Sequence, residues 1–131
     1  MSRACWLFLW SATTLVLVSI RAGGVTGFGY SFADVATATV IDAHLKQHVA
    51  GGNCLDIGVL CSAMVRAIRN LGRPGICSMA ISAADNALWD LKAKLLGVSV
   101  ADLIGRAHPS IAAYGSGGFT SYSEDQLRRQ L

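Results

Sequence analysis

Residues 77–97 read CSMAISAADNALWDLKAKLLG and form the stretch that decides the fold. Small and leucine side chains recur there at helical spacing and fall on one face: Ala80, Ala84, Ala87, Leu88, Leu91 and Leu95. The pattern predicts a helix over residues 77–96 that ends at Gly97, because glycine readily adopts the left-handed conformation of a helix terminus. Since small residues line the face, we expect a neighbouring helix to pack closely against it.

Two weaker helical patterns precede this stretch, and a short one comes after it. Residues 33–49 carry apolar side chains on one face and end before the glycine pair at 51–52. Residues 55–71 have an aspartate in the first turn and arginines in the last turns, as the helix dipole favours, and the break lies at residues 70–75. A short helix is expected over residues 100–104.

The N-terminal region is rich in β-branched residues. Residues 14–20 predict a strand, residues 21–24 a turn, and residues 25–32 the returning strand, with glycines where backbones approach closely. Two other interpretations remain open. Residues 1–22 also resemble a signal peptide, although no small-residue cleavage site comes after the apolar run. A spanning helix would need about 20 consecutive apolar residues, and polar residues interrupt this run.

The C-terminal region predicts one strand, one loop and one helix. Residues 111–114 are apolar, residues 115–118 are mostly glycine, and a helix is expected over residues 124–131. Ser121 with Glu124, or Ser123 with Gln126, can form a capping box at its start. A single parallel strand has no partner to pair with, so this unit alone predicts an unfinished fold.

Composition limits the class of protein. The chain has 131 residues, 53% of them hydrophobic and only 15% charged, with a net charge of +3. The basic residues are scattered and form no stripe that could follow phosphates, so a nucleic-acid partner is not expected. The cysteines form no C-x-x-C pair, and free, buried thiols in a reducing compartment are expected of them: Cys5, Cys54, Cys61 and Cys77.

Residues 79–97 and 100–105 together resemble the first signature of the mandelate racemase/muconate lactonizing enzyme family, within the enolase superfamily. Residues 69–75, 114–119 and 14–30 resemble other segments of the family, and they lie in the same order along the chain. The positions that carry the resemblance are expected to have structural roles: Ala80, Asp85, Ala87, Leu88, Trp89, Asp90, Lys92, Gly97, Leu103 and Gly105.

The resemblance implies an α+β fold and two pieces. Residues 1–107 would be a partial N-terminal capping domain, an antiparallel hairpin followed by a helical bundle, with residues 1–13 unmatched and the first strand missing. Residues 108–131 would be the first strand and the start of the first helix of a truncated (β/α)₈ barrel, since a whole barrel needs about 250 residues. An alternative is a free-standing helical interaction module derived from the capping domain. A second alternative is a small secreted or membrane-anchored protein.

The resemblance also implies a chemistry for intact relatives. They would use Mg²⁺ and barrel residues to abstract the proton next to a substrate carboxylate, which leads to racemisation, cycloisomerisation or acid-sugar dehydration. Their partners would be small carboxylates, and they would be homo-oligomers. Because the catalytic and metal-binding barrel strands would be missing, we expect this chain to be inactive and to bind no Mg²⁺. We expect a cytoplasmic protein with no membrane partner, or a secreted one if residues 1–22 act as a signal peptide.

Few residues of the chain itself are candidates for a site. Ser116, Gly117 and Gly118 would come directly after a barrel strand, where barrel enzymes build their sites. Lys92 and Lys94 point about 200° apart on a helix and are expected to be solvated. Asp85 and Asp90 diverge by about 140°, so a cap, a buried hydrogen bond or the pair of Asp90 with Lys94 is expected instead of a metal site. The i,i+4 histidines are expected to be a surface pair without zinc: His44 and His48.

Overall fold

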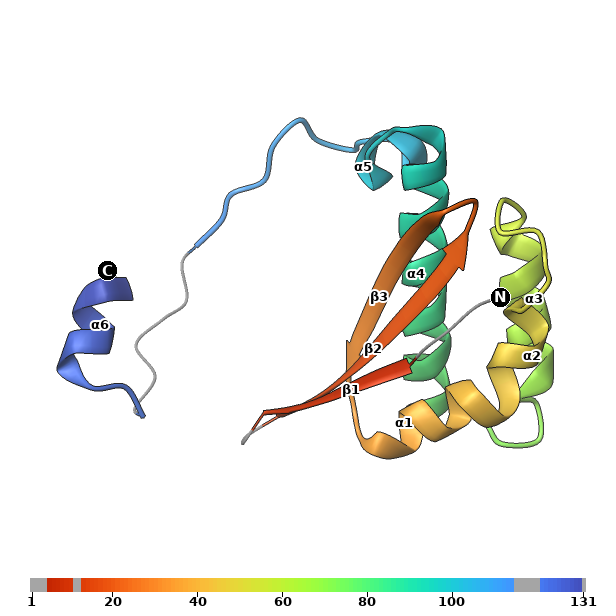
Figure 1. Ribbon diagram of the computed structural model, residues 1–131, viewed down its shortest axis with the longest axis horizontal. Helices are drawn as coiled ribbons and strands as arrows, with labels where there is room; N and C mark the ends of the chain where they lie inside the picture. Colours follow the sequence, from red (N-terminus) through yellow and green to blue (C-terminus); the bar gives the residue numbers. More distant parts are fainter. Residues whose placement is uncertain (1–4, 11–12, 115–120, 131) are drawn as a thin grey trace.

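The computed structural model describes residues 5–10, 13–114 and 121–130, and the side chains of residues 14–114 and 121–130. It contains a three-stranded antiparallel sheet in the order β1-β2-β3 (Figure 1). Strand β2 spans Thr13–Ala22 and β3 spans Val25–Phe32. The predicted hairpin is confirmed. Gly23 and Gly24 form its turn with φ values of 56° and 78°, as a tight two-residue turn between twisted strands requires.

Strand β1, Cys5–Trp10, was not predicted. It pairs with β2 along its whole length, from Cys5 opposite Val18 to Trp10 opposite Thr13. The interpretation that the first strand is missing is therefore wrong. A short continuous apolar run has no period of its own, so a strand cannot be distinguished from the apolar part of a signal peptide by pattern alone.

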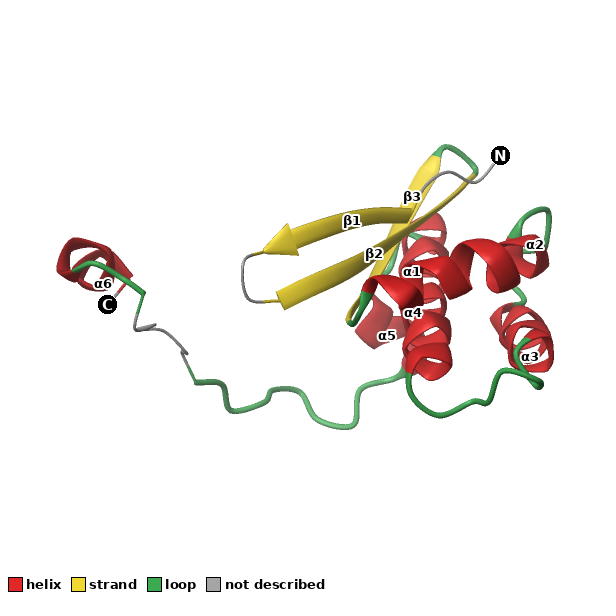
Figure 2. Cartoon of the chain, turned by 90° about the horizontal axis from the view of Figure 1, so that it is seen from below, coloured by secondary structure: helices red, strands yellow, loops and turns green. Residues whose placement is uncertain are grey.

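The helices lie on one side of the sheet, as Figure 2 shows. They are α1 (Val35–Val40), the π-helical turn η1 (Ile41–Leu45), α2 (Lys46–Val49), α3 (Ile57–Ala67), α4 (Ile76–Leu96) and α5 (Val100–Ile104). The first three form one continuous run in the place of the predicted helix over 33–49. Asp34 caps this run by accepting a hydrogen bond from the N–H of Ala36 at 2.8 Å.

The sheet packs on α4, and this contact is unusually close. A Cβ atom added at Gly27 would collide with the backbone of Ala87 and Leu91, and one at Gly29 with the backbone of Ala83 and Ala87. The small residues of the α4 face thus meet two glycines of β3. Neighbouring helices are present as predicted, since α1 and α3 contact α4. The close approach to a strand was not predicted, and there glycine on the strand complements alanine on the helix.

The hydrophobic core lies between the sheet and the helices. Alternate residues of β2 point inward and are buried, as the period of a strand dictates: Val16, Val18 and Ile20. Fully buried side chains of the helices, and of Ile68 directly after α3, meet them: Leu45, Met64, Ile68, Leu88 and Leu91. Helix α4 is therefore the centre of the fold, with the sheet on one side and α1 and α3 on the others.

The C-terminal segment differs from the prediction. Residues 111–114 form no strand, and Ile111 and Tyr114 are each 91% exposed. A strand needs a neighbour to satisfy its backbone hydrogen bonds, and the described part of the chain offers none here. Helix α6, Glu124–Gln130, is confirmed. The capping box at its start is also confirmed. The Ser123 N–H donates to Gln126 Oε1 at 2.9 Å, and the Gln126 N–H donates to Ser123 Oγ at 3.3 Å.

Candidate functional site

The ionisable side chains in the second half of α4 are the strongest candidates for chemistry that the described residues contain. Asp90 Oδ2 accepts hydrogen bonds from the backbone N–H of Phe28 at 2.7 Å and from Lys94 Nζ at 2.6 Å. Lys94 Nζ also donates to the carbonyl of Thr26 at 3.1 Å. Both backbone groups lie on the edge of β3 that faces away from β2, so Asp90 and Lys94 cover an open sheet edge.

Lys92 makes a specific contact on another side of α4. Its Nζ donates to the carbonyl of Leu55 at 2.8 Å and lies 5.6 Å from the centre of the Trp89 ring. Lys94 is exposed to solvent and Lys92 is half-buried, and each ammonium group also binds a backbone carbonyl of another element, which was not predicted. The two side chains point in different directions, as predicted: Lys92 reaches the loop before α3, and Lys94 reaches the sheet. They do not act on one substrate together.

Asp85, Trp89 and Cys61 form a small polar group between α3 and α4. Burial raises the pKa of Asp85, and a side-chain hydrogen bond from Trp89 opposes that shift. Burial also raises the pKa of Cys61, the negative charge of Asp85 raises it further, and the positive charge of Arg73 lowers it. A thiol whose pKa is raised is mostly protonated at neutral pH, so Cys61 is a poor nucleophile here.

The other signature positions have packing or turn roles. Ala80, Ala87 and Leu88 are fully buried. Gly97 has φ 69° and ends α4, where the N–H of Val98 donates to the carbonyl of Ala93 at 3.0 Å. Leu103 is half-buried on α5, and Gly105 comes directly after that helix with φ 86°. Neither position carries a group that could act on a substrate.

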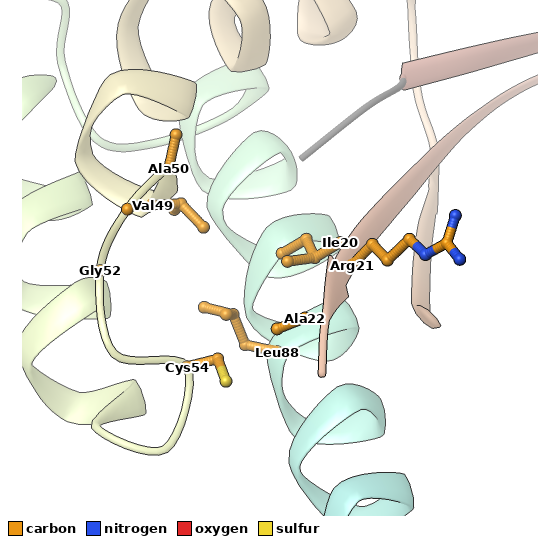
Figure 3. A pocket seen from close by; sticks show the side chains of 9 residues that line it. Ile20, Arg21, Ala22, Val49, Ala50, Gly52, Cys54 and Leu88 are labelled. Carbon is orange, nitrogen blue, oxygen red and sulfur yellow. The ribbon is translucent and has the colours of Figure 1, made fainter. Parts of the chain in front are cut away.

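One cavity of about 210 Å³ lies between the end of β2 and the loop after α2 (Figure 3). Ile20 and Leu88 point toward it, whereas the guanidinium group of Arg21 points away. Cys54 supplies a half-buried sulfur atom, and the rest of the lining is apolar side chains and backbone. The cavity can hold small apolar groups, and it brings together no acid–base pair.

Several predicted candidates do not form a site in the described structure. Ser116, Gly117 and Gly118 lie outside the described residues. His48 is exposed and His44 half-buried, and nowhere in residues 5–10, 13–114 and 121–130 do three His, Cys, Asp or Glu side chains gather as a metal site needs.

The prediction of free, buried thiols is confirmed in part. Cys54, Cys61 and Cys77 are free, as predicted, but only Cys77 is buried. Within the described ranges, no helix is both long enough and apolar enough to cross a bilayer.

The residues that α4 binds on β3 were not predicted from the sequence. Thr26 and Phe28 receive Lys94 and Asp90 through backbone atoms, so their side chains gave no signal. Gly27 and Gly29 did give a sequence signal. Two glycines spaced by two in a strand, in a chain that also has an alanine-rich helix, indicate a close helix–strand contact.

Comparison with known proteins identifies the family. The family described as "Mandelate racemase / muconate lactonizing enzyme, N-terminal domain" matches residues 9–105, a range that begins inside β1. The L-talarate/galactarate dehydratase of Salmonella typhimurium LT2 is 34% identical over 122 residues, which are 89% of this chain and 31% of that protein. The chain thus spans about a third of the length of this relative.

Solved structures agree with this match. A mandelate racemase/muconate lactonizing enzyme-like protein from Rubrobacter xylanophilus superposes with a TM-score of 0.77 at 42% identity, covering 99% of this chain and 36% of that one. An L-talarate/galactarate dehydratase variant solved with Mg and L-glucarate has a TM-score of 0.67 at 34% identity, covering 89% and 31%. This chain belongs to the mandelate racemase/muconate lactonizing enzyme family of the enolase superfamily, and it contains the N-terminal domain of that family.

Proposed function

We propose that this chain is the capping portion of a Mg²⁺-dependent enzyme that abstracts a proton next to a carboxylate, and that the chain alone performs no turnover. The proposal is supported by relatives that include an acid-sugar dehydratase and a 3,6-anhydro-alpha-L-galactonate cycloisomerase. The substrate would be a small carboxylate of the acid-sugar class, as in the structure of a relative that holds L-glucarate.

One observation carries this proposal. The ionisable residues of α4 are occupied by contacts that hold the domain together: Asp90 and Lys94 on the edge of β3, and Lys92 on the carbonyl of Leu55. Both hydrogen bonds of Asp90 fall on its Oδ2 atom, and the two lysine ammonium groups donate to backbone carbonyls, so contacts within the domain hold all three side chains. The helix therefore stabilises a cap, and chemistry would come from a barrel.

The described residues do not fit Mg²⁺. Magnesium in enzymes is held by carboxylates and water in octahedral geometry, and the carboxylates of α4 point to different neighbours. No step of the reaction is therefore assigned to residues of this chain. Its role in the proposal is to cover a substrate that a barrel binds, with a boundary near residue 107 between cap and barrel.

The direct test is an assay of the 131-residue chain with Mg²⁺ and galactarate. We expect no keto-acid product and no specific Mg²⁺ binding by isothermal titration. The Salmonella L-talarate/galactarate dehydratase, assayed in parallel, controls for the substrate and the metal. Turnover by the chain, or a Mg²⁺ site with micromolar affinity, would contradict the proposal.

A chimera tests the capping role positively. Residues 9–105 would replace the matching domain of the Salmonella dehydratase, with the barrel of that enzyme unchanged. We expect Mg²⁺-dependent exchange of the substrate α-proton with solvent deuterium, measured by NMR. A chimera that folds and binds Mg²⁺ but exchanges no proton would show that this domain does not cap a barrel.

We also propose that the protein is cytoplasmic, as the free thiols of Cys54, Cys61 and Cys77 support. N-terminal sequencing of the expressed product tests this location. A start at Met1 or Ser2 agrees with it, and a start after residue 20 would indicate cleavage of a signal peptide.

A further inference from the structure

The cavity between the end of β2 and the loop after α2 is built largely from small residues. Its volume is about 210 Å³. Ile20 and Leu88, which belong to the hydrophobic core, line it and point toward it in Figure 3. Other lining residues have only a methyl group or no side chain: Ala22, Ala50, Gly51 and Gly52. The cavity therefore extends from the surface loop to the core, because these small residues leave the space between them unfilled.

The loop that forms one wall of the cavity is fixed to two helices. A Cβ atom added at Gly52 would lie 2.6 Å from Cδ2 of Leu60, so the loop backbone packs directly on α3. Further along the loop, the carbonyl of Leu55 accepts a hydrogen bond from Lys92 Nζ of α4 at 2.8 Å. A cavity closes only as far as its walls can move, and these two contacts hold the wall that the loop provides.

The lining offers few partners to a polar ligand. The guanidinium group of Arg21 points away from the cavity (Figure 3). In the loop, the N–H of Ala50 already donates to the carbonyl of Lys46 at 2.8 Å, and the N–H of Gly52 donates to the carbonyl of Val49 at 3.1 Å. A water molecule in a cavity needs about two to four polar partners. The lining thus favours an apolar occupant over water or an anion.

Cys54 adds a sulfur atom to this lining. The thiol is free, the residue is half-buried, and its side chain lines the cavity from the side of the loop (Figure 3). Sulfur atoms make favourable contacts with the edges of aromatic rings. An aromatic occupant would therefore gain a contact that an aliphatic one lacks.

We propose that this cavity is a binding site for one small aromatic molecule of about the size of benzene. Apolar protein cavities of about 150 Å³ stay dry and bind benzene, and this cavity is larger. The ring would lie among the side chains of Ile20, Leu88 and Cys54. Such a ligand stabilises the domain, because binding to the folded state alone shifts the unfolding equilibrium. The inference goes beyond the capping role and does not depend on it.

The first test is a titration of the 131-residue chain with benzene, followed by NMR of the methyl groups. We expect saturable shifts at Ile20, Ala22 and Leu88, with a dissociation constant of about 1 mM. The methyl groups of Val59, which is 65% exposed on α3 and is not part of the lining, should not shift. Shifts that do not saturate, or that are as large at Val59 as at Ile20, would overturn the proposal. Cyclohexane should bind more weakly, and equal binding would contradict the aromatic preference.

The second test uses two thiols of the chain. Cys54 and Cys61 are both half-buried, but Cys54 lines the cavity and Cys61 does not, so they form a matched pair. Benzene at about ten times its dissociation constant should slow the alkylation of Cys54 by N-ethylmaleimide about tenfold, since about one cavity in eleven is then empty. The rate at Cys61 should not change. Peptide mass spectrometry measures both rates, and equal slowing at both thiols, or none at Cys54, argues against the site.

The third test fills the cavity. Ala22→Leu adds bulk from the end of β2 and should abolish both effects of benzene. Ala67→Leu is the control, since Ala67 on α3 is half-buried like Ala22 and is not part of the lining. Circular dichroism verifies the fold of each variant. If Ala22→Leu does not fold, Cys54→Leu fills the cavity from the loop and takes its place in the titration. Benzene binding that persists in a folded, filled variant would show that the ligand binds elsewhere.

Discussion

Helix α4 and residues 106–114 of the C-terminal segment show what an apolar sequence pattern does with and without a surface that covers it. Along α4, Leu88 and Leu91 are fully buried against the sheet and the other helices. In the C-terminal segment, Ile111 and Tyr114 are each 91% exposed, although Ile111 is as apolar as leucine and Tyr114 carries an aromatic ring. An apolar pattern therefore forms a regular, buried element only where the chain also supplies the surface that covers it. Residues 5–104 supply that surface for α4.

The largest expected effect breaks the contact between α4 and β3. Gly29→Ala should cost about 4 kcal/mol or more of unfolding free energy, since the new methyl group would collide with the backbone of Ala83 and Ala87. Chemical denaturation measures the loss. Gly58→Ala on α3 is the matched control, because its Cβ would meet nothing within 4 Å, and it should stabilise the chain by about 0.5–1 kcal/mol. Similar effects of both variants would contradict the close packing.

The second prediction compares one apolar side chain from each region. Leu88→Ala should destabilise the chain by about 3 kcal/mol through lost burial and a new cavity. Ile111→Ala should change the stability by less than about 0.5 kcal/mol, because that side chain is already exposed to solvent. Urea denaturation followed by Trp fluorescence measures both. A clear loss in the Ile111 variant would show that the C-terminal segment packs on the domain.

The third prediction concerns the polar cover of the β3 edge. Asp90→Ala should cost about 1–2 kcal/mol, since it removes the acceptor of the Phe28 N–H and the partner of Lys94, and the Asp90 side chain is only 27% exposed. Asp42→Ala removes the ion pair between Asp42 and Lys46, which has the same i,i+4 spacing. The side chains of both residues are more than half exposed. It should cost less than about 0.5 kcal/mol. Equal costs would mean that Asp90 does not protect the edge.

The smallest effect is a dependence of stability on pH. Burial raises the pKa of Asp85 above its ordinary value of 3.8, so the folded chain binds a proton more tightly there than the unfolded chain does. The resulting stabilisation is present below that value and is lost as pH rises through the folded-state pKa. Asp85→Asn should therefore gain stability relative to the natural chain as pH rises above about 4. Denaturation at several pH values measures the difference, and a constant difference would contradict the raised pKa.

The sequence predicted the elements that carry their own signals. The helix over 77–96 differs by one residue from α4, and the hairpin turn lies at Gly23 and Gly24 as expected. Periodicity and turn chemistry act locally, so they can be recognised without the rest of the fold.

The features that could not be predicted depend on contacts between distant residues. Strand β1 is fixed by its pairing with β2, which its own sequence does not reveal. The contact of Lys92 with the carbonyl of Leu55, 37 residues away, was missed because nothing in the sequence places that carbonyl within its reach. Among the candidate site residues, Ser116, Gly117 and Gly118 remain a prediction. The role of Asp90 was predicted only as its pair with Lys94, and its bond to Phe28 was missed.

The contrast between the two regions is tested most directly by native-state hydrogen exchange of the 131-residue chain, followed by NMR or mass spectrometry. We predict that the amides of Leu88, Leu91 and their neighbours in α4 exchange only through global unfolding. The amides of residues 106–114 and of α6 should exchange at nearly the rates of an unstructured peptide. Strong protection in α6, or fast exchange in the middle of α4, would contradict this contrast.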